Sequence, residues 1–180
     1  MPITLKIPFI GDFGSGKTTL AFKFASTPSR FSTQITALNS TSGRYLVKHL
    51  KINDTEIIFQ LWDTESQERF GTVSNDYFQN ASFIVLVFDV TKRQSFENVR
   101  EWAHQIKQTN PHAQIHLIGN KIDSERDVLI QNGQELAREL NMVYHECSAI
   151  TGEGVEDIFE GIGMTAVQRE EENKKKKSCL

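Results

Sequence analysis

The sequence predicts an α/β fold with a mostly parallel six-stranded sheet, which includes one antiparallel hairpin strand and carries helices on both faces. Two observations support this prediction. Short apolar runs alternate with segments of helical periodicity, the order that right-handed strand–helix–strand crossovers produce. A glycine-rich loop also lies between the first apolar run and the first helical segment. With 180 residues, the chain is long enough for one such domain and short for two.

The expected strands are short. Residues 5–10 form the first, although Pro8 removes one hydrogen-bond donor from it. Residues 44–52 and 56–62 are strand-like segments joined by a three-residue turn, which predicts a hairpin. Two later apolar runs are flanked by turn residues, as is typical of parallel strands buried on both faces. They lie at residues 83–89 and 114–119, and a last strand is expected at 142–145.

Helices are expected between the strands. Apolar side chains at helical spacing over residues 95–108 predict one helix, and Pro111 closes it. In the last helix, from residue 155 to 166, Gly161 and Gly163 would each cost about 1 kcal/mol relative to Ala. Residues 31–43 are polar and lack a clear period, which predicts a long surface loop. The other helices are expected at residues 18–25 and 134–140.

Composition narrows the class of protein. A hydrophobic content of 38% and a charged content of 24% are those of an ordinary folded protein, and the net charge of −3 argues against a general nucleic-acid binder. Cys147 and Cys179 form no disulfide or metal pattern, which favours a reducing, cytoplasmic environment. The beginning of the chain does not resemble a signal peptide, and the longest apolar run, residues 83–88, is too short to span a bilayer. Any membrane contact is therefore expected to be peripheral.

The glycine-rich loop, residues 11–18 (GDFGSGKT), fits the pattern of a Gly, four residues, then Gly-Lys-Ser/Thr. In such a loop the backbone N–H groups turn toward phosphate oxygens, Lys17 adds a positive charge, and the Thr18 hydroxyl can bind Mg²⁺. The helix that begins near Lys17 adds the positive end of its dipole. The loop therefore predicts a nucleotide phosphate site.

Polar residues follow the third and fifth expected strands. Asp63 ends the strand at 56–62, where a carboxylate can reach a metal ion held against phosphates, directly or through water. Gln67 lies four residues later and could orient an attacking water. Ligands of such sheets lie beyond the carboxyl ends of the strands, so the glycine-rich loop, Asp63 and Asn120 are expected to meet at one edge.

The segment from Asn120 to Asp123 indicates which base is bound. An amide and a carboxylate held in an extended turn can pair with the donor and acceptor edge of guanine, and Asp123 would accept from its N–H groups. Adenine lacks that pair of donors. The sequence therefore predicts a guanine nucleotide.

Taken together, these motifs resemble those of the Ras-like small GTPases, and most closely those of the Rab branch. The similarity covers nearly all of residues 3–168. Besides the residues above, it includes WDT at 62–64, QERF at 67–70, LVFDVT at 86–91, SF at 95–96 and ECSA at 146–149.

The resemblance implies a single P-loop G domain over residues 1–168 and a charged flexible tail over 169–180. It implies a monomeric molecular switch of vesicle traffic that binds GTP or GDP with Mg²⁺ and hydrolyses GTP. An exchange factor, effectors and a GTPase-activating protein would bind through residues 32–45 and 64–80. The implied catalytic groups are Gln67 and Lys17, and the implied metal ligands are Thr18, Ser40 and Asp63. The implied nucleotide contacts are Gly14, Ser15, Gly16, Lys17, Thr18, Thr19, Phe31, Ser66, Asn120, Lys121, Asp123, Ser148 and Ala149.

The chain departs from the family pattern beside the γ-phosphate and the base. Phe13 stands where the family has a small residue, on the path of an activating protein's arginine finger, and Ser66 replaces a Gly that donates its N–H to the γ-phosphate. Ile150 replaces the usual Lys near the base. We therefore expect slow hydrolysis that resists activation. The alternative is a nucleotide-bound interaction module with a locked switch, a pseudo-GTPase.

One metal ligand depends on the alignment. The interval from Thr18 to Trp62 is about four residues longer than a Rab would have, so counting back from Trp62 selects Ser40, while counting forward from Thr18 selects Thr36. Thr41 is a third candidate. Ser40 is preferred because the hairpin leaves no gap in that alignment.

The end of the chain resembles a polybasic, prenylated Rab terminus. Four lysines at residues 174–177 would contact an anionic leaflet, and each contributes about 1 kcal/mol near such a surface. Cys179 is the candidate for prenylation, but a single residue follows it, so the four-residue Cys-a-a-X pattern is absent. If Cys179 is prenylated, the protein is expected to cycle between the cytoplasm and the cytosolic face of an intracellular membrane.

Overall fold

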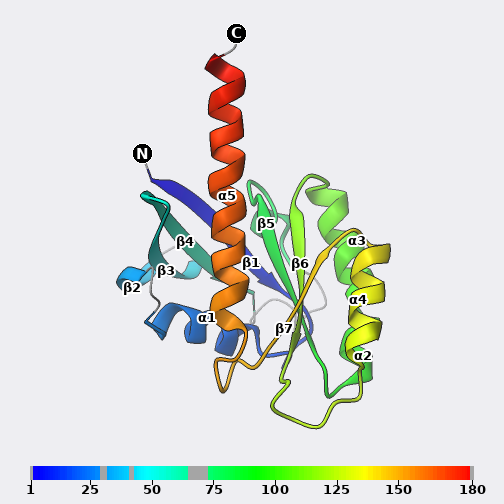
Figure 1. The fold of residues 1–180 in the computed structure, drawn as a ribbon. Helices are drawn as coiled ribbons and strands as arrows, with labels where there is room; N and C mark the ends of the chain where they lie inside the picture. Colours follow the sequence, from blue (N-terminus) through cyan, green and yellow to red (C-terminus); the bar gives the residue numbers. More distant parts are fainter. Residues whose placement is uncertain (1, 29–31, 41–42, 65–72, 179–180) are drawn as a thin grey trace.

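The computed structural model describes residues 2–28, 32–40, 43–64 and 73–178, and residues 32–40, 43 and 44 by their backbone only (Figure 1). A seven-stranded sheet has the order β2-β3-β4-β1-β5-β6-β7. All strand pairs are parallel except β2 with β3 and β3 with β4. The strands are β1 Ile3–Ile10, β2 Ser32–Ser40, β3 Gly43–Ile52, β4 Thr55–Asp63, β5 Phe83–Asp89, β6 Gln114–Asn120 and β7 Val143–Cys147.

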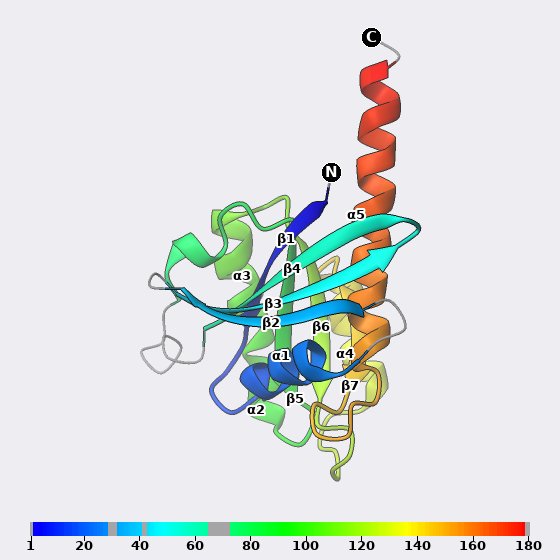
Figure 2. The same cartoon turned by 90° about the vertical axis from the view of Figure 1, so that its left-hand side faces the viewer.

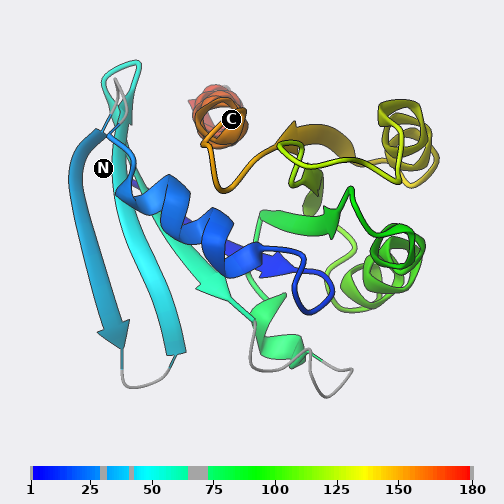
Figure 3. The same ribbon diagram turned by 90° about the horizontal axis from the view of Figure 1, so that it is seen from below.

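Helices cover both faces of this sheet, which confirms the predicted α/β class (Figure 3). Helices α1 and α5 pack on one face in one hydrophobic cluster, while α3 and α4 pack on the other face in a second cluster. The helices are α1 Lys17–Ser26, α2 Arg93–Glu97, α3 Val99–Thr109, α4 Ile130–Glu139 and α5 Val155–Ser178, with a short 3₁₀ helix at Asn75–Tyr77. In the part of the chain that is described, no helix is long and apolar enough to span a bilayer.

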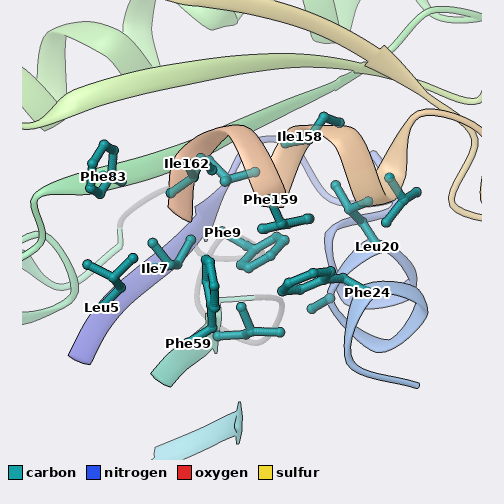
Figure 4. Close-up of a cluster of buried hydrophobic side chains, with 14 of the residues drawn as sticks. Leu5, Ile7, Phe9, Leu20, Phe24, Phe59, Phe83, Ile158, Phe159 and Ile162 are labelled. Atoms are coloured by element: carbon teal, nitrogen blue, oxygen red, sulfur yellow. The ribbon is translucent and has the colours of Figure 1, made fainter. Parts of the chain in front are cut away.

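Aromatic stacking holds α5 and α1 against the sheet (Figure 4). Phe159 of α5 stacks on Phe24 of α1 with ring centroids 3.9 Å apart, and it lies 5.9 Å from the ring of Phe9 in β1. The Phe59 ring of β4 meets Phe24 edge-on at 5.4 Å. Full burial of one such side chain contributes about 1.5–3 kcal/mol, so this cluster fixes the helix that follows the glycine-rich loop.

The segment predicted as a surface loop contains a strand, so that expectation is wrong for residues 32–40. This segment pairs antiparallel with β3 and becomes the edge strand of the sheet, which is the seventh strand (Figure 2). An edge strand has one side open to solvent and needs no apolar period, because hairpin pairing with β3 alone sets its register.

Other boundaries also differ from the expectations. The helix expected at 95–108 is divided at Asn98 into α2 and α3. The tail expected to be flexible from residue 169 is helical through Ser178, because α5 continues past the sheet (Figures 1 and 2). There Lys174 lies 3.8 Å from Glu170 at helical i,i+4 spacing, an arrangement that supports an exposed helix.

Candidate functional site

The glycine-rich loop forms a backbone cradle after β1. Gly11 has a φ of 136°, and a Cβ there would lie 2.0 Å from the carbonyl oxygen of Val87 in β5. Gly16 has a φ of 95°, and a Cβ there would lie 2.3 Å from Nδ2 of Asn120. The space beside Gly14, whose φ is 78°, is open. Glycine is therefore required by close approach at the first two positions, while the third keeps the cradle accessible.

Charged and hydroxyl groups lie at the start of α1, beside this cradle. Lys17 is 2% exposed, and its Nζ donates to the carbonyl oxygen of Asp12 at 2.8 Å. Thr18 Oγ1 donates to Asp63 Oδ2 at 2.5 Å, which joins α1 to the end of β4. A hydroxyl and a carboxylate are hard oxygen donors of the kind that Mg²⁺ prefers, so this pair fits the predicted metal.

Asn120 connects the cradle to the loop that follows β7. Its Nδ2 donates to the carbonyl oxygen of Ser15 at 2.9 Å, and its Oδ1 accepts from the backbone N–H of Ala149 at 3.0 Å. The side chain is buried. Both amide atoms therefore hold neighbouring loops together, a role that the sequence analysis did not assign to this residue.

Asp123 presents an exposed carboxylate at the same edge of the sheet. Ser148 Oγ donates to its Oδ1 at 2.5 Å, and Ser124 Oγ lies 3.5 Å from its Oδ2. A carboxylate has about four lone-pair sites, so the carboxylate keeps capacity to accept from two further N–H groups.

Lys121 spans the two ends of the site. Its φ of 73° is in the left-handed region, and its Nζ donates to the carbonyl oxygen of Gly14 at 2.7 Å and to Asp89 Oδ2 at 2.6 Å. Burial raises the pKa of Asp89, but hydrogen bonds from Lys121 and Thr91 outweigh it, and the pKa lies below its ordinary value. Asp89 therefore stays ionised and fixes the lysine stem above the cradle.

The family of the chain follows from comparison with known proteins. The family model described as Ras family matches residues 6–168. The chain belongs to the Ras family. It is 37% identical over 172 residues to Ras-related protein RABC2b of Arabidopsis thaliana, covering 92% of this chain and 81% of the relative. It is 38% identical over 158 residues to Ras-related protein SEC4 of Candida albicans, covering 86% and 73%. The same-named protein of Saccharomyces cerevisiae is 34% identical over 172 residues, covering 94% and 78%.

These relatives place the chain in the Rab branch of the Ras family, as the sequence motifs predicted. The protein is a small GTPase, a GTP hydrolase of the kind that acts as a switch in vesicle traffic. Ras-family GTPases bind GTP or GDP with Mg²⁺, which agrees with the cradle, the Thr18–Asp63 pair and the exposed Asp123 described above.

Two residues that support the base end of this Ras-family site, Arg126 and Tyr144, were not found from the sequence, and Glu146 was found only as part of the ECSA motif. Arg126 donates to both carboxylate oxygens of Glu146, at 3.1 and 3.0 Å, and Tyr144 Oη donates to the same carboxylate at 2.7 Å. The hydrogen bonds to Glu146 raise the pKa of Arg126, and burial and the same carboxylate raise the pKa of Tyr144. The cluster ties the segment after Asp123 to β7. Asp89 was found as part of the LVFDVT motif, but its contact with Lys121 was not predicted, although Asp89 ends β5 as Asp63 ends β4.

On the phosphate side, several predicted site residues lie outside the described residues. The catalytic candidate Gln67 is one of them, and Thr64, the last residue described before it, donates its Oγ1 to the carbonyl oxygen of Phe9 at 2.8 Å. The segment that leads to Gln67 therefore starts from a fixed point on β1. The other predicted site residues outside the described part are Thr41 and Ser66 on the phosphate side, Phe31 at the base and Cys179 near the end of the chain.

Two candidate metal ligands lie in β2. The backbone of Ser40 pairs with Gly43 at the end of the β2–β3 hairpin that lies nearest Asp63, whereas Thr36 pairs with Val47 in the middle. Neighbouring strands are about 4.8 Å apart, so β2 runs about 10 Å from β4. The structure does not bring either backbone to the Thr18–Asp63 pair, and either residue would have to leave the β2 ladder to reach a metal there.

The remaining departures from the family pattern are exposed. Phe13 is 56% exposed within the glycine-rich loop, and Ile150 is 68% exposed directly after Ala149. Thr19 is also exposed, on the first turn of α1. The ring of Phe13 therefore occupies the outer side of the loop rather than the core.

Proposed function

We propose that this protein is a Rab-like switch of vesicle traffic that binds GTP and GDP with Mg²⁺ at this site and hydrolyses GTP slowly. The observation that carries the proposal is the Thr18–Asp63 hydrogen bond of 2.5 Å beside Lys17, with the Asp123 carboxylate at the same sheet edge. One end of the site suits phosphates and a cation, and the other suits a base with two adjacent donors.

In this proposal the backbone N–H groups of residues 14–19 and the Lys17 ammonium bind the phosphates. Asp123 accepts from the guanine N–H groups, and the backbone N–H of Ala149 faces the same ring. Lys121 covers the ring and the ribose, with Asp89 and the Gly14 carbonyl holding its Nζ. Asn120 contributes mainly by joining these loops, since both of its amide atoms already have partners. The remaining proposed contacts are Ser15, Gly16, Thr18, Thr19, Phe31, Ser66 and Ser148.

Bound Mg²⁺ would neutralise charge on the β- and γ-phosphates. The Thr18 hydroxyl and the Asp63 carboxylate are in place to hold it, directly or through water. Ser40 is the proposed further ligand in the GTP state, and its position at the Asp63 end of the hairpin supports it over Thr36. Gln67 would orient the attacking water, and Lys17 would stabilise charge on the transferred phosphoryl group.

The exposed ring of Phe13 supports slow, activation-resistant hydrolysis. Small GTPases of this kind turn over at about 10⁻⁴ to 10⁻³ s⁻¹ alone, and an arginine finger adds up to about 10⁵-fold. A ring at the mouth of the cradle obstructs both the water and the finger. Its effect is therefore expected to be greatest on activated hydrolysis.

Single-turnover GTP hydrolysis tests this explanation, with and without an activating protein for the Rab branch. Phe13→Gly should raise the activated rate, whereas Phe22→Ala should leave it unchanged. Phe22 is the matched control because it is equally exposed, at 56%, but lies on the outer face of α1. Equal rates for the wild type and Phe13→Gly would remove Phe13 as the cause.

The strand β2 favours a second candidate, a nucleotide-bound interaction module whose switch is locked. Pairing with β3 keeps Thr36 and Ser40 in a ladder at the sheet edge. Extracting the bound nucleotide from the purified protein and following it over time distinguishes the locked module from the cycling enzyme. GTP that persists supports the locked module, while GDP with exchange and turnover supports the cycling enzyme.

We also propose peripheral membrane contact by the end of α5. The helix carries Lys174–Lys177 past the sheet, on the side away from the glycine-rich loop (Figure 1). Prenylation of Cys179 would add the lipid anchor, and mass spectrometry of protein from its native cell tests it.

An exchange factor, effectors and an activating protein are proposed to bind residues 32–45 and 64–80 of a monomer. The protein would cycle between the cytoplasm and the membrane.

A further inference from the structure

Helix α3 holds the second residue of the glycine-rich loop. Trp102 Nε1 donates to Oδ1 of Asp12 at 2.7 Å, and Asn98 Nδ2 donates to Oδ2 of the same carboxylate at 2.7 Å. Asn98 is the N-cap residue of α3, and Trp102 lies one turn later. Each carboxylate oxygen therefore has its own donor from one helix.

The two donors are themselves fixed. The Trp102 indole is 7% exposed and belongs to the cluster between α3 and the sheet. The Oδ1 of Asn98 accepts from Gln94 Nε2 at 3.0 Å, which orients the amide so that its nitrogen faces Asp12. The contact is thus made by a buried indole and by a half-buried amide that has a second hydrogen-bond partner.

The backbone of Asp12 continues this path to the phosphate site. Its carbonyl oxygen accepts from Lys17 Nζ at 2.8 Å and from the backbone N–H of Ser15 at 3.1 Å. This carbonyl is one of the groups that hold the ammonium in place. A path of hydrogen bonds therefore runs from α3 through Asp12 to the lysine that meets the phosphates.

We propose that Asn98 and Trp102 are positioning residues for Lys17, and that they act by fixing Asp12. The proposal rests on the proposed function, because it assigns a task to groups around its phosphate site. Without the two donors, the Asp12 peptide gains freedom and the ammonium loses its fixed place. The alternative is that Asp12 has a structural role alone. It would then accept the hydrogen bond of the buried indole N–H, and its loss would affect folding but not nucleotide retention.

The rate at which fluorescent GDP dissociates from the Mg²⁺-loaded protein distinguishes the positioning role from the structural role. Trp102→Phe keeps an aromatic ring and removes the N–H, and it should accelerate dissociation about 10-fold, as should Asn98→Ala. Asp12→Ala should be at least as fast as either, and adding Trp102→Phe to Asp12→Ala should bring no further change, because both remove the same contact.

The conservative variant Asp12→Asn provides a rescue. Its Oδ1 can still accept from Trp102, but its Nδ2 cannot accept from Asn98, so the rescue should be partial, with a dissociation rate between those of the wild type and Asp12→Ala. Trp62→Phe is the matched control, because Trp62 Nε1 is buried and donates to no atom among the described residues. Its dissociation rate should be unchanged.

The outcomes are distinct. If the wild type retains GDP while Asp12→Ala and Asn98→Ala release it at the wild-type rate, the positioning role is overturned, whatever the effect on thermal unfolding. If Trp102→Phe fails to fold, the half-buried Asn98 and Asp12 variants decide the matter. A wild type that retains no guanine nucleotide contradicts the proposed function instead.

Discussion

The base half and the switch half of the nucleotide site are built differently. In the base half, the polar groups after β5, β6 and β7 bond one another: Asp89 with Lys121, Asn120 with Ala149, and Asp123 with Ser148. In the switch half, Thr18 bonds Asp63 and Thr64 bonds the carbonyl of Phe9, while the backbones of the candidate ligands Thr36 and Ser40 lie in the ladder of an edge strand.

The difference shows which function each half can perform in this conformation. The described loops of the base half are held to one another by buried and partly buried hydrogen bonds within the protein. Among the described residues of the switch half, Thr18, Asp63 and Thr64 are held by side-chain hydrogen bonds, while Thr36 and Ser40 pair with β3 through their backbones. We therefore expect the base to meet a surface that is already formed, whereas a metal contact from Thr36 or Ser40 would require rearrangement of β2.

The largest effect is expected where the two halves meet, at Gly16. Gly16→Ala would place a Cβ 2.3 Å from Asn120 Nδ2 at a φ of 95°, so it should cost about 3 kcal/mol or more of unfolding free energy and release nucleotide. Gly14→Ala meets open space and should cost only the left-handed strain, about 1–2 kcal/mol. Urea unfolding of both variants measures the difference, and equal costs would contradict a tight junction at Gly16.

A smaller loss of stability is expected at acid pH, from a pair of histidines in the strands β6 and β7 that precede the base-half loops. His116 of β6 is buried, and its Nδ1 lies 2.9 Å from Nε2 of His145 in β7. Burial, the neighbouring His145 and the cation of Arg169 on α5 lower the pKa of His116 to about 3. The folded state thus binds fewer protons than the unfolded state, so stability is complete above about pH 6.5 and declines as pH falls toward 3, by up to about 3 kcal/mol near pH 4.

Unfolding free energies at several pH values, with and without His116→Gln, measure this decline. The variant should flatten the slope below pH 6.5. His104→Gln, an exposed histidine on α3, is the control and should leave the slope as in the wild type. An NMR titration of His116 with a midpoint near 6.5 would remove the basis of this prediction.

The sequence could predict the parts of the site that depend on neighbouring residues along the chain, but not the contacts between distant segments. The glycine-rich loop, Asp63 and Asp123 follow apolar strands at set positions, so their shared edge could be predicted. The partners that fix them could not, because Trp102 and Asn98 reach Asp12 from about 90 positions away and Asp89 meets Lys121 from another strand. The edge strand β2 has no apolar period to reveal it, and the division at Asn98 interrupts an otherwise regular pattern of apolar positions.

The smallest predicted change in unfolding free energy concerns the contact between α5 and the β3–β4 hairpin, at the end of the hairpin far from the nucleotide site. Gly163 of α5 packs on the β3–β4 hairpin, where a Cβ would lie 2.7 Å from Cδ1 of Ile52 and 3.1 Å from Cδ1 of Ile57. Gly161 faces open space on the same helix. Gly161→Ala should therefore stabilise the protein by about 1 kcal/mol through helix propensity. Gly163→Ala should lose that gain and cost about 1 kcal/mol, because the isoleucine side chains must move. Thermal unfolding of the pair decides it. Equal stabilisation by both would mean that the side chains of Ile52 and Ile57 yield to the added methyl group, and that close packing on α5 does not fix the hairpin.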